Sequence, residues 1–188
     1  MSYVVQSIER PDVLTAVYRF LAEYLKPYNL SDSIIRGWQN RASLPPGTNN
    51  YIVYSQLGAS RVGTNVQTGI DAAGQMTNAT LYKASVQIDF CSDSDDCRTW
   101  AAYIESILRS DIGTSFFKTF DISSCYSDDL MSVDFVDASE QYVKRSSLTC
   151  YLSYYTKSIF SLEYADKVAL ERLENVDAHH HPTIVSEG

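Results

Sequence analysis

The feature that most constrains the fold is a run of strict alternation from Leu81 to Phe90, LYKASVQIDF. Small, apolar or aromatic side chains occupy its even positions, and polar side chains occupy the odd positions from Lys83 to Asp89. Side chains on a β-strand point alternately to opposite faces, so this pattern predicts a strand with one buried face.

A second strand is predicted from Gln141 to Tyr155 by the same alternation. One of its faces carries Leu148, Cys150, Leu152 and Tyr154, and the other carries Thr149, Tyr151, Ser153 and Tyr155. Both faces are half apolar, so we expect something to pack on each of them.

The segment CSDSDDC, Cys91 to Cys97, follows the first strand and raises the question of a metal site. Structural zinc is held by two matched pairs of Cys or His, and no second pair accompanies this one. A calcium loop starting at Asp93 would need Gly and Glu where the chain has Arg98 and Ile104. We therefore expect no metal site.

The same segment is better interpreted as a strand-to-helix junction. Asp95 and Asp96 lie where a helix N-terminus favours acceptor side chains and negative charge. The helix that follows has one apolar stripe, formed by Trp100, Ala101, Ile104, Ile107 and Leu108.

Other elements are predicted from periodicity and turn residues. An amphipathic helix is expected at Pro11–Lys26. Strands are expected at Ile34–Gln39, Tyr51–Ser60, Ser124–Ser127 and Leu130–Val136. Loops or connectors are expected at Arg41–Asn50, at Val62–Ala79 (a long loop or a loose hairpin) and at Asp111–Phe120. Leu162–Val176 fits a helix or a strand.

Length and composition predict one globular domain over residues 1–178 and a flexible C-terminal tail over 179–188. The net charge of -8 and the lack of basic patches argue against a surface that binds nucleic-acid phosphates. The N-terminus lacks the pattern of a signal peptide and no window is apolar enough to span a membrane, so we expect a cytoplasmic chain with reduced cysteines.

The chemistry of the side chains supports no enzyme. All histidines lie at His179–His181, in the predicted tail, so the folded body has no histidine base. The carboxylate pair Asp128 and Asp129 is typical of a solvated turn. The glycines after Gly58 lack the context of a phosphate-binding loop, and we expect no cofactor.

Three stretches together resemble the neck or tail terminator proteins of tailed bacteriophages. They are IIRGWQNRASLPPGTNNYIVYSQLGASRVGTN, YKASVQIDFCSDSDDCRTWAAYIESILRS and YVKRSSLTCYLSYYTKSIF. The residues that carry the resemblance are Trp38, Gln39, Leu44, Pro45, Tyr51, Val53, Gln87, Asp89, Leu108, Arg109, Ser110, Arg145 and Leu148.

The resemblance implies an α/β (α+β) fold, with a mostly antiparallel sheet packed by two or three helices. It also implies a homohexameric ring in the virion neck, assembled in the host cytoplasm, that caps the tail tube, stops its polymerisation and joins the tail to the head connector. The implied partners are further copies of the chain, the tail tube protein, head–tail connector or adaptor proteins and the sheath protein. Genome DNA would pass through without specific binding, and no membrane is involved.

Candidate interface residues follow from side-chain type and from the resemblance. Arginines suit contacts with the many carboxylates of neighbouring copies, and tyrosines combine a large contact area with a polar tip. The candidates are Arg36, Trp38, Arg41, Arg61, Arg145, Tyr151 and Tyr155. The long loop Val62–Ala79 is a further candidate for contact with a neighbour or the tube.

Two other functions remain open at this point. A head–tail connector adaptor, or completion protein of the neck, would also be a small ring-forming chain. A small metal-dependent hydrolase could use the aspartate-rich junction, in which case the purified protein would hold stoichiometric metal.

Overall fold

The computed structural model describes residues 3–37, 50–136 and 142–162. The strands in this part of the chain are β1 (Tyr3–Glu9), β2 (Ile34–Arg36), β3 (Tyr51–Arg61), β4 (Val66–Gln67), β5 (Gln75–Ser92), β6 (Ile122–Ser127), β7 (Met131–Ser132), β8 (Phe135–Val136) and β9 (Tyr142–Leu162). The helices are α1 (Val13–Tyr24), α2 (Asp96–Leu108) and α3 (Asp111–Lys118), with short 3-10 turns η1 (Lys26–Tyr28) and η2 (Ser31–Ser33).

The strands form one open sheet in the order β1-β9-β5-β3-β2. β5 and β9 pair antiparallel from Gln75↔Ser161 to Ser92↔Lys144 and form the spine of the sheet. The other edge of β9 is shared in turn by β8, β7, β6 and β1. Only the β2–β3 pair is parallel within the described residues, so the predicted mostly antiparallel sheet is confirmed.

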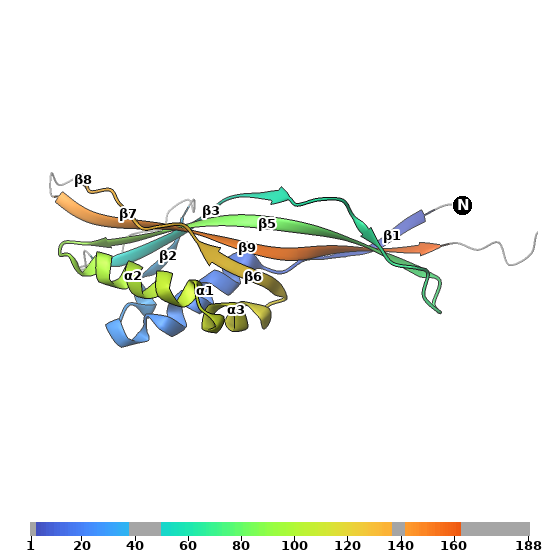
Figure 1. Ribbon diagram of the computed structural model, residues 1–188, viewed down its shortest axis with the longest axis horizontal. Helices are drawn as coiled ribbons and strands as arrows, with labels where there is room; N and C mark the ends of the chain where they lie inside the picture. Colours follow the sequence, from blue (N-terminus) through green and yellow to red (C-terminus); the bar gives the residue numbers. More distant parts are fainter. Residues whose placement is uncertain (1–2, 38–49, 137–141, 163–188) are drawn as a thin grey trace, which may run out of the picture.

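All three helices lie on one face of this sheet (Figure 1). The two alternating runs point their apolar positions at that face, as predicted. Ala84, Val86, Ile88 and Phe90 are fully buried, as are Cys150 and Leu152 of the second run. Burying these side chains against the apolar stripes of α1 and α2 is the main source of stability for the described fold.

The segment Asp111–Lys118 is a helix, α3, and not the predicted connector. It is short and contains Gly113 and Thr114, which are weak helix formers, so its periodicity is faint in the sequence. Tertiary packing stabilises it: Phe117 is fully buried and stacks on Phe20 of α1 with ring centroids 5.0 Å apart.

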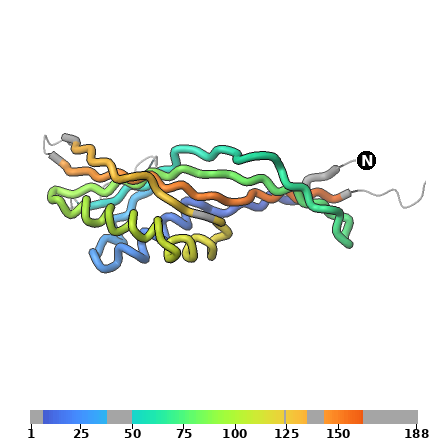
Figure 2. Tube along the Cα trace, viewed as in Figure 1, coloured from blue at the N-terminus to red at the C-terminus, as the bar shows by residue number. Residues whose placement is uncertain are grey.

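Beyond the helices the sheet continues as a long projection (Figures 1 and 2). We call residues 3–9, 57–82 and 155–162 the arm, and the helix-covered remainder of the described chain the head. The arm keeps a large apolar surface in solvent, since Ile8 is 66% and Val66 59% exposed.

The arm agrees with the sequence prediction in one respect and departs from it in another. The segment Val62–Ala79 forms the second of the two predicted structures, a loose hairpin, in which Val66 and Gln67 pair with Ala79 and Asn78. β1 was not predicted, because its first residues, YVV, are followed by polar ones with no clear alternation.

Other elements agree with small shifts in their bounds. β2 ends at Arg36 rather than at Gln39, and the strand predicted at Leu130–Val136 is divided into β7 and β8. Most of the loop Arg41–Asn50 and nearly all of Leu162–Val176 lie outside the described residues, as does the tail from His179.

Candidate assembly surfaces

The segment CSDSDDC joins β5 to α2, which confirms the strand-to-helix junction. Ser94 hydrogen-bonds the first residue of the helix. Its hydroxyl donates to Asp96 Oδ2 at 2.7 Å and accepts from the Asp96 amide at 3.3 Å. Asp95 takes the N-cap position, but its side chain makes no cap hydrogen bond, unlike the prediction. Lys144 draws it away by donating from Nζ to Asp95 Oδ1 at 2.9 Å.

The cysteines beside this junction are buried and free. Burial raises the pKa of the Cys91 thiol to about 11, which keeps it protonated and unreactive at neutral pH. Across the described residues, no group of three or more His, Cys, Asp or Glu side chains converges in a way that could hold a metal ion. The junction therefore presents charge and hydrogen-bonding groups at one end of the head.

The sheet face opposite the helices carries an aromatic and charged cluster. Tyr126 of β6 stacks on Tyr151 of β9 with ring centroids 4.8 Å apart, because the two residues are paired across the strands. The Lys83 ammonium lies 4.6 Å from the Tyr151 ring and donates to the Tyr126 hydroxyl at 2.7 Å. The Tyr151 hydroxyl donates to Asp128 Oδ2 at 2.7 Å, and this bond raises the Tyr151 pKa.

This tyrosine–lysine cluster contains one residue expected from the sequence, Tyr151, and three that were missed. Lys83 lies far along the chain from Tyr126 and Asp128, and only the strand register brings it to them. Tyrosine is enriched at protein–protein interfaces, so the cluster is a candidate contact surface.

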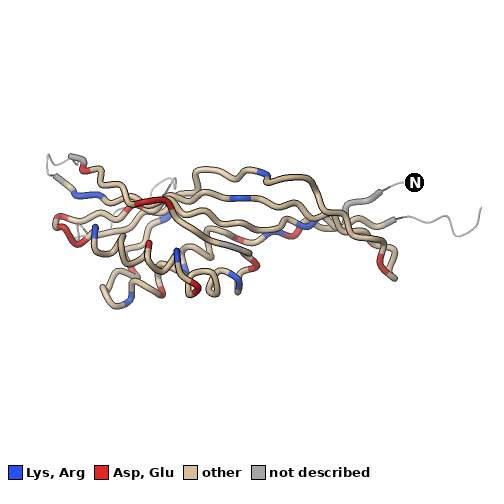
Figure 3. The backbone as a smooth tube through the Cα atoms, in the orientation of Figure 1, with Lys and Arg blue, Asp and Glu red and all other residues tan. Residues whose placement is uncertain are grey.

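Acidic and basic residues are interspersed over the described surface, without a large basic block (Figure 3). Arg109 contacts two carboxylates: Nη2 lies 2.7 Å from Asp129 Oδ1 and 3.1 Å from Glu105 Oε1. These contacts raise the Arg109 pKa, with the Asp129 bond as the largest cause. Arg109 was noted in the sequence only for the family resemblance.

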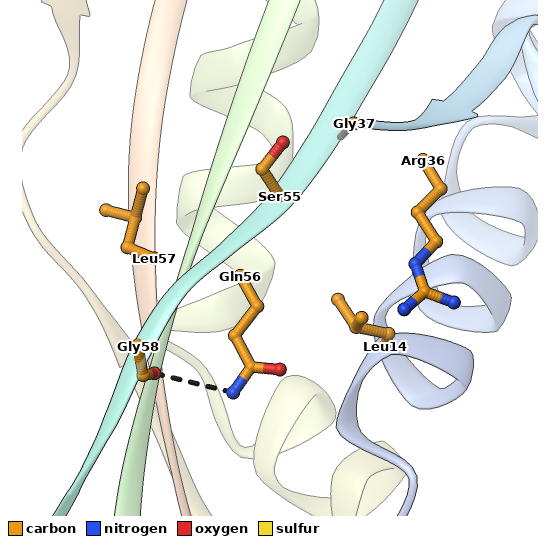
Figure 4. Close-up of a pocket in the computed structure, with 7 residues that line it drawn as sticks. All are labelled: Leu14, Arg36, Gly37, Ser55, Gln56, Leu57 and Gly58. Carbon is orange, nitrogen blue, oxygen red and sulfur yellow. Dashed lines mark hydrogen bonds between the residues drawn. The ribbon is translucent and has the colours of Figure 1, made fainter. Parts of the chain in front are cut away.

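Arg36 lines a hollow of about 610 Å³ where the head meets the arm (Figure 4). Leu14 of α1 and Gln56, Leu57 and Gly58 of β3 complete most of its wall. A second hollow shares Leu14, Arg36 and Gln56 with the first and adds Arg10. The predicted interface residue Arg36 thus lies in a concave surface, close to a second arginine.

The remaining predicted interface residues are spread over the molecule. Arg61 holds the start of the arm hairpin, since Nε donates to the Gly63 carbonyl at 2.9 Å. Arg145 lies on the open face of the sheet, with Nε 4.0 Å from Asp89 Oδ1. Tyr155 is exposed where the arm begins. Trp38 and Arg41 lie outside the described residues.

Taken together, the described surfaces suit binding by shape. The arm exposes apolar area, the open face offers tyrosines, and the head–arm junction offers a hollow with two arginines. Extended apolar surface rimmed by polar groups is the mark of a protein that assembles with other proteins. The fold and surfaces therefore define a structural assembly protein.

The comparison with protein families names the class more closely. Residues 15–183 match the family described as phage neck terminator protein, and the chain belongs to this family. It is accordingly a structural phage protein of the neck, acting in tail termination and in contact with other tail or head–tail proteins. No curated protein matches the chain. None of the described helices is long and apolar enough to cross a membrane.

Proposed function

We propose that copies of this chain close into a homohexameric ring that caps the head-proximal end of the tail tube. The ring stops polymerisation of the tube protein and offers its other side to the head connector. The observation that carries this proposal is the arm. A sheet normally buries at least one face, and this part of the sheet projects beyond every described helix.

A head-to-tail contact fits the asymmetry of the molecule. The arm and the helix-covered head are different surfaces at opposite ends of one elongated subunit. If the arm of each copy lies on the next copy, the contact is heterologous, and it ends growth only when the rotation closes into a ring. A closed ring leaves no free site for another copy.

The charge balance supports passage of DNA through the ring without adhesion. The net charge of -8 repels a phosphate backbone, and the described cations are dispersed among carboxylates. We propose that the bore of the ring is acidic or neutral. A ring structure with Lys and Arg lining the bore would contradict this part of the proposal.

We also propose that the protein makes and breaks no bonds, and that the sheath protein, where the tail has one, is a further neighbour. Metal analysis of the purified protein tests the alternative of a metal-dependent hydrolase. Stoichiometric metal, together with hydrolysis of a phosphate ester or a peptide, would overturn the structural role.

Electron microscopy of phage lysates lacking this protein tests the main proposal. We expect tails of irregular length and tails unattached to heads, both corrected by supplying the protein from a plasmid. Tails of normal length that merely fail to join heads would favour the connector adaptor function. Normal particles would contradict both functions.

The adaptor alternative is separated further by the partner that the protein retains. A terminator should pull down the tail tube protein, whereas an adaptor should pull down the connector on the portal side. The terminator function predicts that the natural protein retains the tube protein in a pull-down at physiological salt.

A further inference from the structure

β3 has a strand edge that the described residues leave largely open. β2 pairs with β3 only from Ile52 to Tyr54, and the Gly37 amide adds one more bond to the Tyr54 carbonyl at 2.8 Å. Beyond this point β3 runs to Arg61 with no further strand paired on this side within the described residues. An exposed edge of this kind is a template for an added chain.

The hollow at Arg36 lies directly beside this open edge (Figure 4). Leu57 is 55% exposed next to the hollow, and Leu14 contributes a second apolar wall. The charged residues that line the two joined hollows are two arginines, Arg10 and Arg36, and one carboxylate, Asp12. The site therefore suits a segment that carries both apolar side chains and carboxylates.

We propose that this site binds residues 168–177 of a second copy of the chain, VALERLENVD. The segment carries four branched apolar residues and three carboxylates against one arginine, which complements two leucines and an excess of arginine. It also lies within residues 15–183, the part of the chain that matches the family. The inference rests on the proposed function, because it requires copies to assemble.

The occupant comes from another copy because of reach. β9 ends at Leu162, one residue beyond Ser161, which pairs with Gln75 of β5, whereas the hollow at Gln56 is level with Val86 of β5. The strand from Gln75 to Val86 spans about 36 Å at the usual rise of a strand. Residues from Leu162 to Val168 span at most about 22 Å when fully extended. Within its own chain, only residues from about Leu173 onward could reach the hollow, and only if the chain is almost fully extended. We therefore assign the whole segment to a second copy.

Disulfide trapping between separately tagged chains tests this site. One chain carries Leu57→Cys and the other Leu173→Cys, and the assembled mixture is oxidised. We expect a disulfide between the two tagged chains. The matched control replaces Leu57→Cys by Ile112→Cys, because Ile112 is 58% exposed but lies on α3 in the head. An equal yield with the control, or a disulfide formed only within a chain carrying both substitutions, would overturn the proposal.

Charge reversal gives a second test. Arg36→Glu should weaken assembly about tenfold in native mass spectrometry, the scale of one charge-assisted contact. Adding Glu171→Arg and Glu174→Arg to the same chain should restore assembly, whereas Lys118→Glu, on the outer part of α3, should leave it unchanged. Failure of the restoration would contradict the pairing of these segments.

These tests separate the inference from the proposed function. If the natural chain assembles into rings while Leu57→Cys and Arg36→Glu behave like their controls, this contact is wrong and the ring remains. If the natural chain forms no ring even with tube protein present, the proposed function fails first, and this inference fails with it.

Discussion

At the scale of single residues, Gly113 shows how closely α3 approaches the end of α2. A Cβ at this position would lie 2.5 Å from the Ile107 carbonyl oxygen and 3.1 Å from Leu108 Cα. Both are backbone atoms and cannot move aside cheaply. We predict that Gly113→Ala lowers the free energy of unfolding by about 1–3 kcal/mol, the usual cost of overpacking, as measured by urea denaturation.

The control for this prediction is Gly69→Ala in the arm hairpin, where nothing lies within 4 Å of the added carbon. Its unfolding free energy should match that of the natural chain or exceed it slightly, because alanine restricts the unfolded chain. A Gly113 variant as stable as the Gly69 variant would show that α3 does not pack on α2 as described.

Cys150 gives a prediction about alkaline pH. Complete burial raises the pKa of its thiol to about 12, from an ordinary value near 9. Between these values the folded chain keeps a proton that the unfolded chain loses, so stability is full below pH 9 and falls as the pH rises. One such group contributes a slope of about 1.4 kcal/mol per pH unit.

The measurement compares unfolding free energies at pH 8 to 10.5 for the natural chain and Cys150→Ala. The variant is expected to be less stable at pH 8, because a buried group is removed, but to lose stability less steeply above pH 9. Tyrosines with raised pKa values contribute equally to both chains, so the difference in slope isolates the thiol. Identical slopes would mean that Cys150 is accessible to water.

At the scale of elements, β5 and β9 are each divided between two environments. Near the helices their alternate side chains are buried, as at Val86 and Leu148, whereas the side chains of β5 in the arm are only half-buried. We predict by hydrogen-exchange mass spectrometry that Val86–Phe90 of the isolated subunit exchanges much more slowly than Met76–Thr80, because local opening of the arm breaks few packed contacts. In the assembled ring the arm should become protected.

The two parts of β5 serve as controls for each other, because both form backbone hydrogen bonds to β9 and differ in their packing. Uniform slow exchange along β5 in the isolated subunit would contradict the description of the arm as an unsupported sheet. Unchanged exchange of the arm after assembly would show that the arm lies outside the interfaces.

The elements of the head could be predicted from the sequence because each buries one face. Alternation in Leu81–Phe90 and the stripe ending at Leu108 both report that burial directly. The arm could not be predicted in the same way: both its faces meet solvent, so its Thr, Ser, Asn and Gly residues show no period and resemble a loop. α3 was missed because packing, and not propensity, stabilises it.

The candidate surfaces were predictable only where one residue carries the signal. Arg36 and Tyr151 were chosen by side-chain type, and the structure places one in the hollow and the other in the tyrosine–lysine cluster. Lys83 and Tyr126 could not be found from the sequence, since their meeting depends on the pairing of β6 with β9.

At the scale of the whole molecule, the two ends of the subunit, the head and the arm, differ. The head has its own core, and the arm projects beyond the helices and exposes apolar side chains such as Ile8, Val66 and Ile70 (Figure 1). The chain belongs to a family of phage neck proteins, and we propose that a neighbouring copy covers the arm. The resulting ring would act through its geometry and not through a reaction.

The most direct test is to add the purified protein to growing tubes of the tail tube protein and to measure tube length by electron microscopy. The account predicts that growth stops, and that each stopped tube carries one ring at one end. Tubes that continue to lengthen at the same rate, with the protein absent from their ends, would contradict it.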